Sequence, residues 1–189
     1  MLQVRNLSFD DVEHSVLQQI DFSIKSGCLL HVKGENGAGK TTLLKLLAGL
    51  LHPLEGGIIC QESVCYLGHQ NGVNMRLTPE EHIRFDLGVH DFKKADEMLA
   101  YFNLDAVRDR PCGLLSAGQK RRVGLLRLLA TDAKLWLLDE PLVGLDEVNT
   151  KALGACLKAH LQHKGSVILT AHHTLPFTLD SNVYQVLML

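Results

Sequence analysis

The chain has 189 residues, of which 46% are hydrophobic, so it is long enough for one folded domain with a sizeable core. This hydrophobic content excludes an intrinsically disordered chain. The formal net charge of −2 disfavours a protein that acts on nucleic acid, because such proteins are usually basic. The apolar runs are much shorter than the roughly 20 residues of a membrane-spanning helix, so we expect no segment that crosses a bilayer.

Apolar runs with β character alternate along the chain with segments of helical periodicity. We predict strands at residues 2–9, 22–24, 28–33, 64–67, 135–138, 167–170 and 183–189. We predict helices at residues 41–51, 78–87, 91–102, 120–130 and 147–163, the second starting at a Thr78–Glu81 capping box and the third at Asp91. This alternation predicts an α/β fold with a largely parallel sheet. Residues 71–114 show only helical patterns, which predicts a helical lobe inserted into a single domain of residues 1–189.

A glycine-rich segment between a predicted strand and a predicted helix fits the phosphate-binding pattern G-x-x-x-x-G-K-[ST]. It reads Gly34-Glu35-Asn36-Gly37-Ala38-Gly39-Lys40-Thr41 and is followed by Thr42. Glycines let the backbone approach a phosphate closely, and the N-terminus of the next helix adds partial positive charge. We predict that Lys40 reaches the β- and γ-phosphates of a nucleotide and that Thr41 binds Mg²⁺. The alternative is a glycine turn that binds nothing, and both flanking elements argue against it.

A second motif is an apolar strand that ends in two acids, Leu135-Trp136-Leu137-Leu138-Asp139-Glu140-Pro141. Ligands of open α/β sheets bind at the carboxyl ends of the strands, and this strand would deliver Asp139 to that edge. We predict that Asp139 reaches the Mg²⁺ shell and that Glu140 orients or deprotonates an attacking water. A strand that merely ends in a polar turn is the alternative, and the phosphate-loop pattern in the same chain disfavours it.

The third motif, Leu115-Ser116-Ala117-Gly118-Gln119, lies just before a predicted helix that Ser116 would cap. A simple helix cap is the alternative interpretation, but the three motifs together resemble the ATP-binding cassettes of the ABC family. The family signature is L-S-G-G-Q, so Ala117 replaces its first glycine. The resemblance runs from Gly34 to His172. It implies a P-loop cassette with a mostly parallel sheet, N-terminal antiparallel strands and an inserted helical lobe.

The resemblance also implies an ATPase that uses ATP and Mg²⁺ and works as two copies facing head to tail. Ser116–Gln119 of one copy would then touch the γ-phosphate held by Gly34–Thr42 of the other. Gly144-Leu145-Asp146 resembles the loop that links the two nucleotide sites. His172 resembles the switch histidine that contacts the γ-phosphate, with His173 as the alternative.

Two positions depart from the family pattern. The family usually has a glutamine, which contacts Mg²⁺ and the attacking water, after the strand that follows the phosphate-loop helix. Here His69 stands at that position, and Gln70 could replace it with a shift of one residue. The family often stacks the adenine on an aromatic residue, and Asp11 occupies that position. These departures leave open what completes the water site and what contacts the base.

Within the family, Tyr66-Leu67-Gly68-His69 and the run Lys134–Pro141 are similar to the cassettes of bacterial cytochrome c maturation systems. This similarity implies a role in the export or release of haem or a haem-chaperone complex, with an integral membrane permease as the partner. We expect a peripheral location on the cytoplasmic face of the inner membrane. Our candidates for a groove that receives the permease are four apolar residues of the lobe, each of which could equally be lobe core: Met75, Leu77, Ile83 and Phe85.

Three alternatives remain at this point. A cassette for another cargo would share every motif. A soluble DNA-repair or translation ATPase is disfavoured, because the segment between Thr42 and Leu115 lacks sustained heptads and the chain has one cassette and a net negative charge. A degenerate cassette that binds ATP without hydrolysing it is disfavoured by Asp139, Glu140 and His172, while His69 leaves it slightly open.

Overall fold

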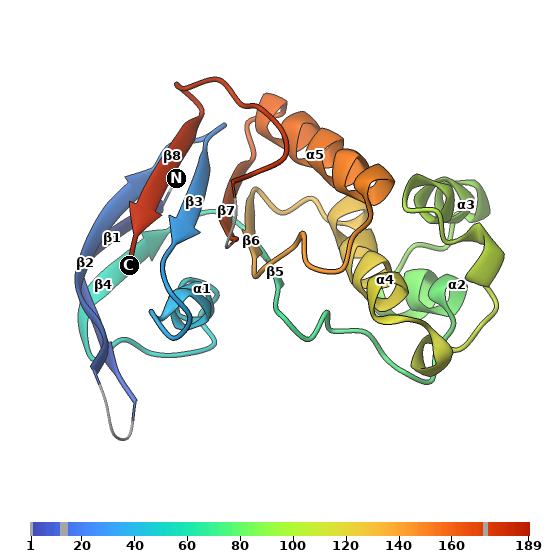
Figure 1. Cartoon of the computed structure of the whole chain (residues 1–189), viewed down its shortest axis with the longest axis horizontal. Coiled ribbons are helices and arrows are strands. Elements are labelled where there is room, and N and C mark those ends of the chain that lie inside the picture. Colours follow the sequence, from blue (N-terminus) through green and yellow to red (C-terminus); the bar gives the residue numbers. More distant parts are fainter. Residues whose placement is uncertain (1, 12–14, 172–173) are drawn as a thin grey trace. The chain divides into compact units, whose positions relative to one another are not determined.

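The computed structural model describes residues 2–11, 15–171 and 174–189, which fall into two compact units (Figure 1). The sheet unit comprises the chain up to Gly68, together with Ala133–Pro141 and Leu157–Leu189. The helical unit comprises His69–Asp132 and Leu142–Cys156. The chain therefore leaves the sheet unit twice, once after Gly68 and once after Pro141, and the second return falls inside a helix.

The first sheet of the sheet unit has three antiparallel strands in the order β2-β1-β4: β1 (Leu2–Asp10), β2 (Ser15–Ile24) and β4 (Glu55–Cys60). The register of β1 against both neighbours shifts near Asn6, which has a φ of 46°. Gly56, with a φ of 80°, lies so close to the carbonyls of Arg5 and Asn6 that any side chain there would collide with them. Only glycine suits both this backbone angle and this close approach.

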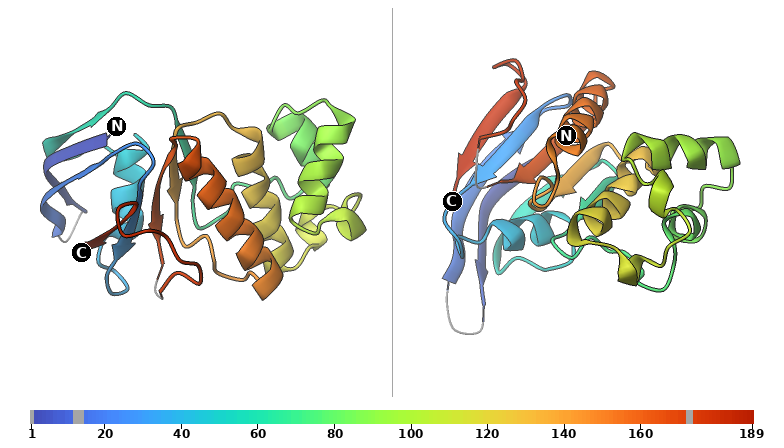
Figure 2. Two further views of the ribbon diagram at one scale, coloured as in Figure 1. Left: turned by 90° about the horizontal axis from the view of Figure 1, so that it is seen from above. Right: turned by 45° about the vertical axis from the view of Figure 1, so that its right-hand side comes forward.

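The second sheet has five parallel strands in the order β5-β6-β7-β3-β8. They are β3 (Leu29–Lys33), β5 (Val64–Leu67), β6 (Leu135–Leu138), β7 (Ser166–Thr170) and β8 (Tyr184–Met188). The right-hand view of Figure 2 shows β8 in red beside β3 in blue, with β7 in orange next to β3. Every residue of β6 and β7 is buried, as expected for the centre of a parallel sheet. Because the strands are parallel, the segments that follow them begin at one common edge.

Helix α1 (Lys40–Leu47) packs against both sheets. Its four buried leucines share one hydrophobic core with residues of β1, β3, β6 and β7 such as Val4, Leu30, Leu137 and Ile168. Burial of each leucine contributes about 1.5–3 kcal/mol before the entropic costs of folding. This packing fixes the position of the α1 N-terminus at the end of the glycine-rich loop that precedes the helix.

The helical unit contains α2 (Pro79–Glu81), a π-helical segment at His82–Asp86, α3 (Phe92–Tyr101), α4 (Ala117–Ala130) and the start of α5 (Glu147–Gln162). Short 3₁₀ turns occupy Asp105–Val107 and Cys112–Leu114. Both predicted caps are confirmed: Thr78 and Glu81 form a capping box, and Asp91 accepts a hydrogen bond from the backbone of Lys94 at 3.1 Å. Within the described ranges, no helix is long and apolar enough to cross a membrane.

The predicted fold class is confirmed, and the differences are local. The strand β4 was missed, because Glu55-Gly56-Gly57 begins it and glycines are depleted in strands. The helix predicted at 41–51 begins at Lys40 and ends at Leu47, since Gly49 takes a φ of 71°. The strand predicted at 22–24 is the end of the longer β2.

Of the two alternatives left open for Ile83, groove or lobe core, the structure supports lobe core. Ile83 was a candidate for an exposed apolar groove, but it is fully buried in the core of the helical unit. Phe85, on the same π-helical segment, is 72% exposed, and Met75 is 48% exposed. Leu77 is half-buried. Residues two positions apart lie on opposite faces of a helix, so Ile83 and Phe85 could not both line one groove.

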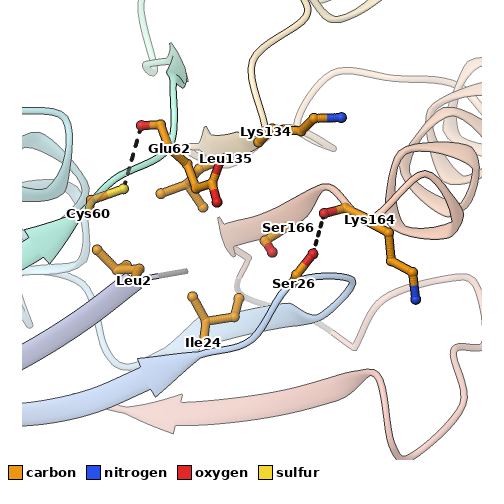
Figure 3. A pocket seen from close by; sticks show the side chains of 9 residues that line it. All are labelled: Leu2, Ile24, Ser26, Cys60, Glu62, Lys134, Leu135, Lys164 and Ser166. Carbon is orange, nitrogen blue, oxygen red and sulfur yellow. Dashed lines mark hydrogen bonds between the residues drawn. The ribbon is translucent and has the colours of Figure 1, made fainter.

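A small hollow in the sheet unit lies at the amino-terminal ends of β6 and β7, opposite the edge at which the phosphate-loop and acidic motifs follow their strands (Figure 3). Leu135 and Ser166 begin β6 and β7, whereas Asp139 follows the end of β6. Ser26 Oγ donates to the Lys164 carbonyl at 2.5 Å, and Ser166 Oγ donates to the Lys25 carbonyl at 3.1 Å. Main-chain carbonyls already bind both hydroxyls, so this hollow is a packing feature away from the phosphate-loop edge.

Candidate nucleotide-binding site

The phosphate-loop pattern forms a tight turn between β3 and α1. Gly37 and Gly39 take φ values of 87° and 86°, which only glycine adopts without strain. A Cβ on Gly39 would also lie 2.8 Å from a methyl group of Leu17 and 3.0 Å from the Val16 carbonyl on β2. The loop therefore needs glycine at Gly39 for two independent reasons, backbone angle and space.

The first turn of α1 is poised to receive an anion. Among the described residues, no side chain accepts a hydrogen bond from the backbone at this helix N-terminus. Lys40 is 8% exposed, and its Nζ donates to the carbonyls of Gly34 at 2.9 Å and Glu35 at 2.8 Å. An ammonium group and helix N–H groups thus converge on one loop, which is the electrostatic arrangement that binds phosphate.

Asp139 connects three elements at the carboxyl edge of the parallel sheet. It follows β6 and is 1% exposed. Its Oδ2 accepts a hydrogen bond from Thr41 Oγ1 of α1 at 2.8 Å, and its Oδ1 accepts one from Thr170 Oγ1 of β7 at 2.8 Å. These bonds compensate part of the cost of burying a carboxylate. The structure thus brings together two residues that the sequence predicted for a metal, Thr41 and Asp139.

Glu140 has an unusual backbone conformation for a residue other than glycine. Its φ is 50°, and its backbone N–H donates to Thr170 Oγ1 at 2.8 Å. A left-handed residue of this kind costs about 1–3 kcal/mol and persists only where its surroundings hold it. Thr170 therefore orients both acids. It bonds the carboxylate of Asp139 and the backbone N–H of Glu140.

Two residues at this edge were missed by sequence reasoning. Thr170 lay in a predicted strand and carried no motif signal. The pKa of the Tyr66 hydroxyl is raised above its ordinary value, first by burial and then by the negative charge of Asp139. Tyr66 therefore keeps its proton at neutral pH and lies within electrostatic reach of Asp139. Tyr66 lies near Asp139 because β5 pairs with β6 in the sheet, and the sequence does not show this strand order.

The signature segment begins helix α4 in the helical unit. Gln119 N donates to Ser116 Oγ at 3.2 Å, and Ser116 N donates to Gln119 Oε1 at 2.8 Å, which closes a capping box. A Cβ on Gly118 would lie 2.5 Å from the carbonyl oxygen of Gly144. The structure therefore brings the signature together with the Gly144–Asp146 segment within one unit. Ala117, the departure from the family signature, is exposed.

His69 and Gln70 are both exposed and follow β5 at the start of the helical unit. The next two residues are anchored on α4, because Arg121 donates to Asn71 Oδ1 at 2.5 Å and Arg127 donates to the Gly72 carbonyl at 3.0 Å. Asp11, at the position of the adenine-stacking residue, is exposed. His172 and His173 lie outside the described residues.

A protein-family model described as "ABC transporter" matches residues 17–143 of this chain. The chain therefore belongs to the ABC transporter family, and it is an ATPase of the ABC type that binds nucleotide. Two solved structures agree. An ATP-binding subunit of an ABC transporter has a TM-score of 0.80 at 25% identity and matches 91% of this chain and 79% of its own. An ABC transporter ATP-binding protein from Pyrococcus furiosus has a TM-score of 0.81 at 27% identity, covering 98% and 96%.

Relatives with a higher sequence identity than these two structures are named "Cytochrome c biogenesis ATP-binding export protein CcmA". The protein from Legionella pneumophila strain Paris is 47% identical over 191 residues, covering 93% of this chain and 94% of the relative. The protein from Vibrio cholerae serotype O1 is 40% identical over 188 residues, covering 91% of each. The similarity therefore extends over nearly the whole chain, beyond the motifs.

Proposed function

We propose that this chain is the ATP-hydrolysing subunit of an exporter in cytochrome c biogenesis, with haem or a haem-chaperone complex as its cargo. The observation that carries the ATPase part is the position of Asp139, hydrogen-bonded to Thr41 of the phosphate-loop helix and followed by Glu140. The names of the relatives support the setting in cytochrome c biogenesis. The haem cargo is inferred from the resemblance of Tyr66–His69 and Lys134–Pro141 to the cassettes of cytochrome c maturation systems.

In this proposal, the segment Gly34–Thr42 holds the phosphates of ATP. The backbone N–H groups of the loop and of the first turn of α1 face the anion, and Lys40 exchanges its carbonyl partners for the β- and γ-phosphates. Thr41 and Asp139 would hold Mg²⁺. Their hydroxyl and carboxylate oxygens are 2.8 Å apart, and such hard oxygen donors are the ligands that Mg²⁺ prefers. When bound, this ion would neutralise charge on the phosphates.

Glu140 is the residue that we propose as the general base for the attacking water. Its backbone is fixed by Thr170, so the carboxylate starts from a defined place at the sheet edge. We further propose that His172 contacts the γ-phosphate and that His69 takes the place of the family's glutamine near the water. Gln70 is the alternative to His69, because both are exposed in the same turn. Activity retained in His69→Gln but lost in His69→Ala would support His69, whereas loss in Gln70→Ala alone would favour Gln70.

Two copies of the chain would enclose ATP between them. In that arrangement Ser116, Ala117, Gly118 and Gln119 of one copy face the γ-phosphate bound by the other. The N-terminus of α4 is a suitable anion site by its dipole, although the capping box already occupies part of it. We therefore propose that the signature contributes mainly when the two copies close on ATP.

The membrane partner would be an integral permease of the CcmB type, which would hold the chain on the cytoplasmic face of the inner membrane. The docking residues that we propose are Met75 and Phe85 of the helical unit. Both are apolar and exposed, at 48% and 72%. Ile83 is excluded from this surface by its burial.

The test is co-expression of the chain with a CcmB-type permease from the same source. The chain should move to the membrane fraction, and its ATP turnover should rise. Phe85→Asp should release the chain while ATP binding and the melting temperature stay unchanged, because Phe85 makes few buried contacts. A matched exposed position, Phe92→Asp on α3, should leave membrane association intact if docking is specific to Phe85; Phe92 is 67% exposed. A chain that remains in the soluble fraction beside this permease would contradict the proposed partnership.

A further inference from the structure

A buried histidine on β3 joins two strands of the parallel sheet. His31 is 0% exposed, and its Nε2 lies 3.1 Å from the carbonyl oxygen of Ala171, which directly follows β7. Its Nδ1 lies 2.8 Å from the hydroxyl of Tyr184 on β8. The two rings meet edge-on, with centroids 6.1 Å apart. Both ring nitrogens of His31 are therefore engaged in the core of the sheet unit.

These partners define which nitrogen of His31 carries the proton. The Ala171 carbonyl can only accept a hydrogen bond, so Nε2–H is the donor. In the neutral ring Nδ1 is then an acceptor, and the Tyr184 hydroxyl donates to it. Burial lowers the pKa of His31, and the charge of Lys33 lowers it further, while the bond to Ala171 acts in the opposite direction. The neutral ring with this single tautomer is therefore the form present near neutral pH.

The residue before Ala171 is the one that holds both acids of the nucleotide site. Thr170 Oγ1 donates to Asp139 Oδ1 and accepts from the backbone N–H of Glu140, each at 2.8 Å. A continuous chain of hydrogen bonds and one peptide unit thus runs from Tyr184 through His31 and the end of β7 to the two acids. Catalytic groups must be held within a fraction of an ångström, and buried polar networks supply that rigidity.

We propose that His31 is a positioning residue for ATP hydrolysis, locked by Tyr184 so that its imidazole N–H fixes the end of β7 and, through Thr170, the two acids. The proposal rests on the assignment of catalysis to Asp139 and Glu140 made above. It assigns no contact with ATP to His31, because Ala171 and Thr170 separate its side chain from the two acids along the hydrogen-bond chain. Loss of His31 should therefore lower kcat and leave nucleotide binding nearly unchanged.

The experiment measures kcat and KM for ATP with the full chain, together with the melting temperature. We expect kcat to fall about tenfold or more in His31→Leu, which removes both hydrogen bonds, with KM changing less than about twofold. We expect His31→Gln to recover part of that loss, because an amide N–H can still donate to Ala171. Tyr184→Phe should lower kcat about fivefold, since it removes the hydroxyl that fixes the tautomer.

His82→Gln is the matched control, because His82 is also 0% exposed but lies in the helical unit, outside this hydrogen-bond chain. It should lower the melting temperature without a selective loss of kcat.

The proposal is overturned if His31→Leu folds with the kcat of the original chain. It is also overturned if Leu and Gln at position 31 lower kcat equally while Tyr184→Phe has no effect, since His31 would then act only by packing. Tyr184→Phe and His31→Gln keep the test decisive should His31→Leu not fold. Failure of Glu140→Gln to abolish turnover would instead refute the site assignment itself.

Discussion

The N-termini of α1 and α4 carry the phosphate-loop and signature motifs, and these two helix ends are built in opposite ways. At α1 the N-cap is Gly39 in a left-handed conformation, and among the described residues no side chain caps the helix. At α4 the N-cap is Ser116, and a reciprocal capping box with Gln119 bonds the backbone N–H groups of Ser116 and Gln119. The α1 end leaves its donors available for a ligand, whereas the α4 end already has two of its backbone N–H groups bonded within the chain.

This difference indicates how each motif would act. A helix end with free donors and a converging ammonium group binds phosphate within a single chain. A helix end that is capped by its own side chains binds an anion weakly unless another surface holds the anion against it. This agrees with a signature that acts only when two copies close on ATP. Tests of the two ends should therefore separate nucleotide affinity from turnover.

The largest effect on binding should come from Lys40→Ala. It removes the charged donor of the α1 site, and we expect ATP affinity to fall about 10- to 100-fold. Calorimetric titration with ATP measures this change. Lys120→Ala is the matched variant in the first turns of α4, where Lys120 donates to the Gly113 carbonyl, and it should leave affinity unchanged. Equal losses in both variants would contradict the contrast between the two ends.

Gly118→Ala should lower turnover with little change in ATP affinity. The added methyl group would meet the Gly144 carbonyl oxygen at 2.5 Å, so the signature or the Gly144–Asp146 segment must move. Overpacking against backbone costs about 1–3 kcal/mol, and we expect roughly a tenfold fall in kcat. Ala117→Gly, which restores the family signature at an exposed position, should leave kcat nearly unchanged and serves as the control. A Gly118→Ala enzyme with normal kcat would show that this contact has no role in turnover.

Ser116 allows capping to be separated from any role in turnover. Ser116→Ala should lower the free energy of unfolding by about 1 kcal/mol, because the N-cap acceptor is lost. Ser116→Asp should retain the cap and the stability, yet reduce turnover, because a carboxylate would repel a γ-phosphate. Denaturant unfolding and ATPase rates measure the two properties. Normal turnover in Ser116→Asp would argue against a phosphate near the signature.

The smallest effect concerns pH and three histidines whose pKa values are lowered by burial, His31, His82 and His160. Because the folded chain disfavours their charged form, the unfolded chain binds protons first as the pH falls. Their contribution to stability is complete above the unfolded pKa of about 6.5 and is lost as the pH decreases below it. Melting temperatures between about pH 8 and pH 5 should decline on the acid side. His160→Gln should flatten part of that decline, and an unchanged slope would exclude His160 as a contributor.

The fold and the motifs of the sheet unit were largely predictable because their signals are local. Apolar runs fix β3, β6 and β7 as central strands, and the phosphate-loop and acidic motifs follow β3 and β6 directly in the chain. The contacts of Asp139 with Thr41 and Thr170 were beyond the sequence, because they depend on strand order. The same dependence on strand order explains why the sequence did not indicate the side-chain contacts of Thr170 and His31 or the position of Tyr66 near Asp139.

The helical unit was less predictable. Its elements were recognised by caps such as Thr78 and Asp91, but the exposure of individual residues was not. Ile83 and Phe85 are two positions apart and so lie on opposite faces of the helix, but both are apolar, and the sequence did not show which of the two faces the core. The left-handed conformation of Glu140 was equally invisible, since glutamate seldom adopts it.

The most direct test of the proposed ATPase site is the turnover of Glu140→Gln beside its ATP affinity. Glutamine keeps the shape and hydrogen bonds of glutamate but cannot accept a proton from water. We expect hydrolysis to fall about 100- to 10,000-fold while ATP still binds with nearly unchanged affinity, so that the variant accumulates in the ATP-bound form. Near-normal hydrolysis by Glu140→Gln would contradict the assignment of the general base and, with it, the site at the end of β6.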